Sequence, residues 1–104
     1  KIMLASAGAE ETPTPLGTYY ISDRGKSFFA PRFGEGALYW VRFYKTYLFH
    51  SMPRDPSWNM KEDAVKRLGK PASHGCVRFL DEDAQWFYEN VPKGAMVIIH
   101  DFAR

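Results

Sequence analysis

The feature that most constrains the fold is the run over residues 37–51, which is dense in aromatic and β-branched side chains. Such residues favour strands, and a run of this length exceeds a typical single strand. The pattern therefore predicts a hairpin that turns near Tyr44 and Lys45. It also places His50 at the end of the second strand, from which a rigid sheet can present a side chain to a cleft.

Two further strands are expected, one before this hairpin in the sequence and one after it. The Pro-containing segment 12–17 is typical of a loop, and residues 18–21 have strand composition, so a strand should start near Gly17. Residues 95–99 form a continuous apolar run of strand length, which predicts a buried core strand.

One helix is predicted over residues 82–90. Asp81 is the expected N-cap, acidic residues fill the first turn, and Pro92 follows the last turn. Residues 52–70 are mixed and polar, with two prolines and Trp58, and they predict a long surface loop or lid with at most one helical turn. Several strands and one convincing helix indicate a mainly β fold.

The length and the charge distribution of the chain argue against several classes of protein. A length of 104 residues and an apolar fraction of 45% fit one globular domain. The formal net charge is +2 and the basic residues are scattered, which argues against nucleic-acid binding. No apolar stretch approaches the roughly 18 residues of a membrane span, and the first residues lack a signal-peptide pattern. We interpret the abrupt start as that of an excised or processed fragment.

The single cysteine, Cys76, excludes an internal disulfide and lies in the segment Ser-His-Gly-Cys-Val-Arg of residues 73–78. A lone cysteine is more often a small buried side chain than a nucleophile, but these neighbours favour the nucleophile. Nearby cationic groups lower the pKa of a thiol and favour the reactive thiolate. Gly75 permits a sharp turn, so that backbone amides near Cys76 can point at a developing oxyanion, where one donor contributes about 3 kcal/mol.

A nucleophilic cysteine needs a base, and the chain offers three histidines. His74, two positions before Cys76, would point to the opposite face of an extended segment, so we interpret it as a structural or electrostatic neighbour. His50 can reach the thiol only through the fold, as is usual for such pairs, and is the predicted base. His100 is interpreted as an ordinary surface or packing residue.

Zinc is an alternative use of His50, His74 and Cys76, because imidazole and thiolate are preferred zinc ligands. Structural zinc sites usually have four protein ligands, and the sequence has no second cysteine and no paired-ligand spacing. We therefore predict neither a metal nor another cofactor.

Residues 73–78, together with the upstream Phe-His-Ser of residues 49–51, resemble the signature of the L,D-transpeptidase catalytic domain family, also called the YkuD-like domain. Residues 14–19 resemble the family's early loop-to-strand segment, and residues 83–99 its closing helix, turn and strand. The resemblance covers most of the chain from Thr12 onward. It implies one catalytic domain over residues 1–104, mainly β and sandwich-like, with one short α-helix near the C-terminus and without its opening N-terminal strand.

The resemblance also implies a chemistry. Cys76 would attack the carbonyl of the third residue of a peptidoglycan tetrapeptide stem, release the terminal D-alanine and form a thioester. An amine of a neighbouring stem would then attack this acyl-enzyme and give a 3→3 cross-link. His50 would be the base, oriented by the backbone carbonyl of Ser51, and backbone amides around His74, Gly75 and Cys76 would form the oxyanion hole. The enzyme would be exported to the cell wall or periplasm, and carbapenems would acylate Cys76.

Three residues are candidates for substrate binding, namely Ser73, Arg78 and Trp58. Arg78 could hold a substrate carboxylate through a bidentate contact or could anchor its own loop. Trp58 and Met52 could line the donor site or pack against the body of the domain. We expect a monomer.

Rival functions remain open. Water in place of the acceptor amine would make the enzyme an L,D-carboxypeptidase. A sortase-like transpeptidase also uses Cys, His and Arg, but sortases separate Cys from Arg by a longer segment and lack the Ser-His-Gly-Cys run. Papain-like cell-wall peptidases place Cys before the catalytic His, whereas here His50 precedes Cys76. A non-catalytic wall-binding module would use the aromatic content of 16% for carbohydrate stacking or peptide docking.

Overall fold

The computed structural model describes residues 3, 5–8, 13–66 and 75–100 of the chain. Five strands form one sheet in the order β1-β6-β5-β4-β3, and two strands form a second, antiparallel sheet. Strands β5 and β6 run parallel, and the other neighbours in the large sheet are antiparallel. The larger sheet consists of β1 (Ala5–Ser6), β3 (Arg24–Ala30), β4 (Glu35–Tyr44), β5 (Tyr47–His50) and β6 (Val77–Phe79). The smaller sheet consists of β2 (Gly17–Tyr20) and β7 (Met96–Ile99), and the helices are α1 (Glu62–Lys66) and α2 (Asp81–Asn90).

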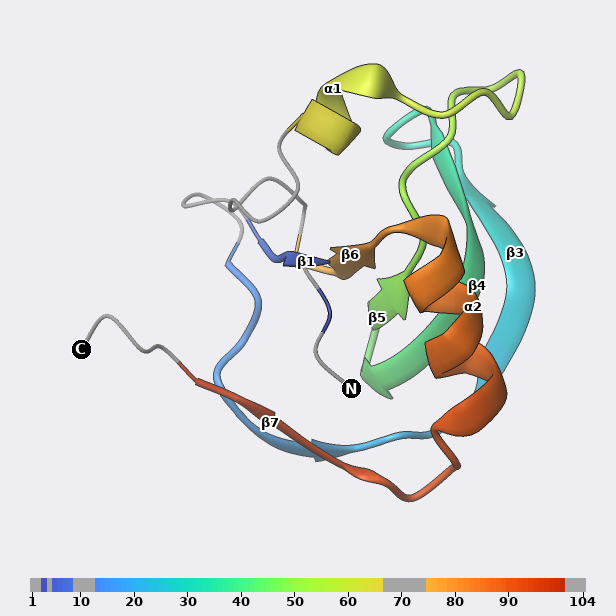
Figure 1. The fold of residues 1–104 in the computed structure, drawn as a ribbon. Helices are drawn as coiled ribbons and strands as arrows, with labels where there is room; N and C mark the ends of the chain where they lie inside the picture. The colour runs from blue at the N-terminus through green and yellow to red at the C-terminus, as the bar shows by residue number, and fades with distance from the viewer. Residues whose placement is uncertain (1–2, 4, 9–12, 67–74, 101–104) are drawn as a thin grey trace.

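The elements are arranged around the strongly curved pair β3 and β4 (Figure 1). Helix α2 covers one side of β4, β5 and β6, while α1 and the ribbon of β2 and β7 lie at opposite ends of the molecule (Figure 1). The mainly β fold with one short helix near the C-terminus is confirmed.

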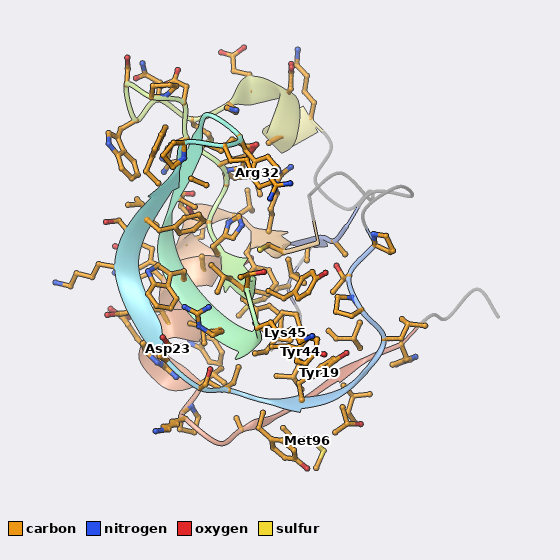
Figure 2. The ribbon with its side chains drawn as sticks, turned by 180° about the vertical axis from the view of Figure 1, so that it is seen from behind. Tyr19, Asp23, Arg32, Tyr44, Lys45 and Met96 are labelled. Atoms are coloured by element: carbon orange, nitrogen blue, oxygen red, sulfur yellow. The ribbon has the colours of Figure 1, made fainter. Side chains whose placement is uncertain are left out.

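The hairpin predicted over residues 37–51 is confirmed. Strand β4 ends at Tyr44, β5 begins at Tyr47, and these two residues pair across a two-residue loop. Lys45 in that loop has φ 47, the left-handed conformation that a tight hairpin turn requires. Figure 2 shows Tyr19, Tyr44 and Lys45 close together, and the Tyr19 and Tyr44 ring centroids lie 4.7 Å apart. The turn is thereby packed against β2.

An aromatic core fills the space between the sheet and α2. The ring centroid of Phe49 lies 5.7 Å from that of Phe79 and 4.6 Å from that of Phe87. Ala84, 1% exposed, brings the helix backbone close to the strands. Arg24 of β3 donates hydrogen bonds to the carbonyls of Tyr88 and Val91, so a guanidinium satisfies the C-terminal end of α2.

The predicted N-cap of α2 is wrong. Leu80 occupies the N-cap position with an extended backbone, and no side chain caps the helix there. Asp81 is instead the first helical residue, and its carboxylate forms an ion pair with the buried Arg54.

The strand predicted over residues 95–99 is confirmed, but it is buried on one face only. The strand is present as β7, but Met96 and Ile98 are each 60% exposed and Val97 alone among its residues is buried. Within the described part of the chain, β7 pairs with β2 and no second layer packs on the outer face of this ribbon. Figure 2 shows Met96 pointing away from the body.

The first residues of segment 52–70 do not form the surface loop that was predicted. Met52 and Pro53 are fully buried and Arg54 forms a bridge with Gly36, so this stretch belongs to the body rather than to a surface loop. Next comes a tight turn in which the Asp55 carboxylate accepts hydrogen bonds from the backbone of residues 57 and 59. The expected single helical turn is α1. Residues 67–70 lie outside the described residues.

Strands β1, β3 and β6 were not predicted.

Among the described residues, no helix is long and apolar enough to cross a membrane.

Candidate active site

The parallel pairing of β5 with β6 brings the two predicted catalytic residues to the same face. Phe49 pairs with Val77 and His50 with Arg78. Because side chains alternate along a strand, the core-facing Phe49 and Val77 direct His50 and Cys76 to the face opposite α2. His50 and Cys76 line the same cavity, of about 650 Å³.

The cavity is lined by the concave faces of β3 and β4, the β4–β5 turn and the ends of β5 and β6. Its aromatic and apolar walls carry three arginines and one carboxylate, so its charged groups are mostly cationic. The charged lining residues are Arg32, Arg42, Arg78 and Glu35.

His50 is held in the tautomer that a general base needs. Its Nδ1 lies 2.7 Å from the backbone carbonyl oxygen of Ser51. A carbonyl can only accept, so Nδ1 carries the hydrogen and Nε2 keeps a lone pair. His50 is 6% exposed and meets the ring of Phe28 edge-on, with centroids 5.4 Å apart. Burial lowers the pKa of His50 to about 4, against the opposing effect of the Ser51 carbonyl and with a further contribution from Arg78.

Ser51, the residue that orients this histidine, is itself fixed at every polar atom. Its N–H donates to the Leu38 carbonyl at 3.0 Å, and its hydroxyl accepts the Leu38 N–H at 2.9 Å. The hydroxyl also donates to the Met52 carbonyl at 2.9 Å. The Ser51 hydroxyl thus takes the place of a backbone carbonyl in accepting the Leu38 N–H next to the β4–β5 pairing. The sequence analysis missed this role.

Cys76 immediately precedes β6, with its Sγ near the β4–β5 turn. The Leu48 N–H donates to Sγ at 3.4 Å, and Sγ lies 3.8 Å from the Thr46 carbonyl oxygen. Burial raises the pKa of the Cys76 thiol above its ordinary value, although the Leu48 N–H and the positive charge of Arg78 act in the opposite direction. The expectation that neighbouring groups favour the thiolate is therefore not met, because loss of hydration outweighs them. Both shifts favour a neutral thiol and a neutral imidazole over a thiolate–imidazolium pair.

Gly75 is required at its position for two separate reasons. Its φ of +116° lies in a region that residues with a side chain rarely adopt. A Cβ at Gly75 would also lie 2.4 Å from Cε1 of Tyr47, closer than real contacts allow. The sharp turn expected at this glycine is present.

Arg78 contacts an acidic partner that the sequence analysis did not identify. Its guanidinium lies 3.1 Å from a carboxylate oxygen of Glu35, and Lys61 approaches the other oxygen at 3.7 Å. Arg78 and Glu35 are both largely buried at the cavity wall. The two residues are 43 positions apart, and the only local signal was a charged residue between two glycines at the start of the aromatic run.

Three further residues considered in the sequence analysis, Trp58, Met52 and His100, are not among those that line the cavity. The ring of Trp58 packs against Phe29 at a centroid distance of 6.2 Å. Met52 packs in the body, and His100 is exposed after β7. Ser73 and His74 lie outside the described residues.

The described part of the chain contains no group of three His, Cys, Asp or Glu residues arranged to hold a metal ion. The zinc alternative involved His74, which lies outside those residues.

Comparison with known proteins matches this chain to L,D-transpeptidases. The profile of the L,D-transpeptidase catalytic domain family, YkuD, matches residues 1–99. The Bacillus subtilis (strain 168) protein YciB, named for a proposed L,D-transpeptidase activity, is 40% identical over 103 residues, which cover 93% of this chain and 53% of that protein. The chain therefore spans about half the length of this relative.

Solved structures agree with this match. An L,D-transpeptidase from Mycobacterium tuberculosis H37Rv is 32% identical with a TM-score of 0.78, covering 95% of this chain and 42% of that chain. The LD transpeptidase LdtMt1, solved in complex with imipenem, has a TM-score of 0.79 at 21% identity, covering 96% of this chain and 49% of that chain. At that identity the second likeness concerns the fold.

Proposed function

The chain belongs to the L,D-transpeptidase catalytic domain family, and we propose that it catalyses acyl transfer between peptidoglycan stem peptides, with Cys76 as the nucleophile and His50 as the base. The observation that carries this proposal is the shared cavity. It holds the Cys76 thiol together with an imidazole whose Nδ1 is occupied by the Ser51 carbonyl.

In the first half of the reaction, Nε2 of His50 takes the Sγ proton as sulfur attacks the carbonyl carbon of the third stem residue. The raised pKa of Cys76 and the lowered pKa of His50 disfavour a preformed thiolate–imidazolium pair, so we propose that proton transfer accompanies attack. The tetrahedral oxyanion collapses, the C–N bond to D-alanine breaks, and the imidazolium returns its proton to the leaving amine. A thioester on Cys76 remains.

In the second half, an amine of the third residue of another stem attacks the thioester. His50 takes a proton from this amine, the C–S bond breaks, and a 3→3 cross-link forms while the thiol is regenerated. Water as the acceptor would give an L,D-carboxypeptidase from the same site.

The charged groups of the cavity support a substrate that carries carboxylates. Three arginines and one glutamate line the cavity. Arg78 is paired with Glu35 and Arg42 with Asp23, so the excess of positive charge rests on Arg32. Arg78 is anchored by Glu35, which orients its guanidinium, and we propose that this guanidinium contributes to carboxylate binding. The proposed substrate implies action outside the cytoplasm, in the cell wall or periplasm.

The test is incubation of the intact chain with purified disaccharide-tetrapeptide, with protein and products followed by mass spectrometry. We expect loss of D-alanine, a transient acyl mass on Cys76 and dimeric product, all absent from the Cys76→Ala variant. Release of D-alanine without dimer would assign the carboxypeptidase. A substrate that stays intact while the chain still binds peptidoglycan would favour the wall-binding module instead.

A further inference from the structure

Thr14 connects the N-terminal part of the chain to the turn before Cys76. Its hydroxyl is 2.8 Å from the Gly8 backbone nitrogen and 2.7 Å from the Gly75 carbonyl oxygen, and the residue is 8% exposed. The Gly8 N–H can only donate and the Gly75 carbonyl can only accept. The hydroxyl hydrogen must therefore point at Gly75.

This bond fixes the orientation of a peptide that adjoins the thiol. The described peptides are all trans, so the carbonyl of Gly75 and the N–H of Cys76 point in opposite directions across one plane. A carbonyl held toward Thr14 thus directs the Cys76 N–H to the other side. The chain of donors from Gly8 through Thr14 to Gly75 also polarises the peptide, which strengthens the N–H as a donor.

The conformational freedom of glycine explains how an anchor at Gly75 can matter. A glycine adds no side-chain packing of its own, and its backbone has more accessible conformations than that of any other residue. The Tyr47 ring limits the space on one side of Gly75, whereas the Thr14 hydroxyl acts on its carbonyl directly.

We propose that Thr14 is a positioning residue for catalysis, which holds the Gly75–Cys76 peptide so that the Cys76 N–H can stabilise the oxyanion. The inference rests on the proposed function, because it assumes that Cys76 attacks a carbonyl. Thr14 itself touches neither the substrate nor the reacting atoms.

Two reagents for the same thiol separate this role from a structural one. Opening of the imipenem β-lactam by Cys76 passes through an oxyanion, whereas alkylation by iodoacetamide displaces iodide at a saturated carbon and forms none. Removing an oxyanion donor slows catalysis by roughly 100- to 1000-fold, so a donor that is retained but misaligned should cost roughly 10- to 100-fold. For Thr14→Val we expect this loss in acylation by imipenem, with alkylation within about twofold of wild type.

Matched variants complete the experiment. Thr14→Ser keeps the hydroxyl and should acylate within about threefold of wild type. Val97→Ala, buried in β7 and absent from the cavity lining, controls for a general loss of stability and should acylate normally. Thr14→Ala removes the same hydroxyl without adding a methyl beside the carbonyl, and it serves if Thr14→Val does not fold.

Equal slowing of acylation and alkylation in the hydroxyl-free variants would overturn the proposal, and so would normal acylation in them. A wild-type thiol that is alkylated but never acylated would instead overturn the proposed function itself.

Discussion

Two pairs of strands in this molecule have similarly apolar sequences but opposite environments. In the pair β5 and β6, six of seven residues are buried, since α2 packs on one face and the cavity walls lie on the other. In the ribbon of β2 and β7, one residue in eight is buried and the outer face presents Met96 and Ile98. Apolar composition alone does not decide whether a strand becomes core. The number of layers around it does.

This difference predicts where stability and activity are coupled. His50 and Cys76 lie on the reverse side of the strands that form the aromatic core, so changes to that core should alter both properties. Changes on the outer face of β7 should alter neither.

The largest effect is expected for Phe49→Ala, which removes the ring at the centre of the core. Phe49 is 8% exposed and contacts the rings of Phe43, Phe79 and Phe87. Such truncations cost about 3–5 kcal/mol, a large share of the stability of a small domain. Urea unfolding measures the loss, and Ile98→Ala on the exposed ribbon should cost less than about 1 kcal/mol. Equal losses would remove the proposed distinction between the two strand pairs.

The next effect is a pH dependence that arises from His50. Its pKa is about 4 in the folded protein against 6.5 as the ordinary value, so the unfolded state binds more protons between these values. Stability is therefore fully present above about pH 6.5 and declines as the pH falls, by up to about 3 kcal/mol near pH 4. In His50→Gln this component should be absent. Parallel curves of unfolding free energy against pH for the two proteins would show that the imidazole is not buried as described.

Two glycines with positive φ allow a matched pair of substitutions, and the larger expected effect is similar in size to that of His50. Gly75 has φ +116° and no room for a Cβ, whereas Gly94 has φ +89° and open space around it. Gly75→Ala should slow acylation of Cys76 by roughly 100-fold, equivalent to about 3 kcal/mol in the barrier. Gly94→Ala should lower stability by about 1 kcal/mol through backbone strain and leave acylation unchanged. A normal rate in Gly75→Ala would mean that the turn tolerates rearrangement.

The smallest effect is expected on the outer face of β7. Ile98→Thr and Met96→Thr replace side chains that are 60% exposed, so each should change the free energy of unfolding by less than about 0.5 kcal/mol. Acylation rates should match wild type. A large loss in either assay would reveal a role for this face that its exposure does not suggest.

How much of the fold could be predicted depended on whether the signal was local. The hairpin and α2 were predicted because their signals, strand-forming composition in the one and helical spacing with acidic residues in the first turn in the other, lie within short windows of sequence. The burial of β7 could not be, because a continuous apolar run does not indicate how many layers will cover it. Strand β3 begins with Arg24 and Gly25, lacks a clear alternating pattern, and is defined by its pairing with β4.

In the candidate site, too, residues with a local sequence signal were predicted, whereas roles that depend on distant contacts were not. Cys76 and His50 were predicted as nucleophile and base from residue type and motif, and the pairing of β5 with β6 is what brings them to one cavity. Glu35 and Thr14 were missed in their present roles, since each contacts a residue more than 40 positions away. The raised pKa of Cys76 was missed because burial cannot be judged from neighbours in the sequence.

The most direct test of the central claim is time-resolved mass spectrometry of the intact chain with imipenem, followed by mapping of the adduct. We expect a single acyl adduct on Cys76, none in Cys76→Ala, and formation slowed by at least roughly 100-fold in His50→Gln because the general base is lost. An unmodified wild-type thiol, or acylation at the same rate in His50→Gln, would contradict the assignment of Cys76 as the nucleophile that His50 activates.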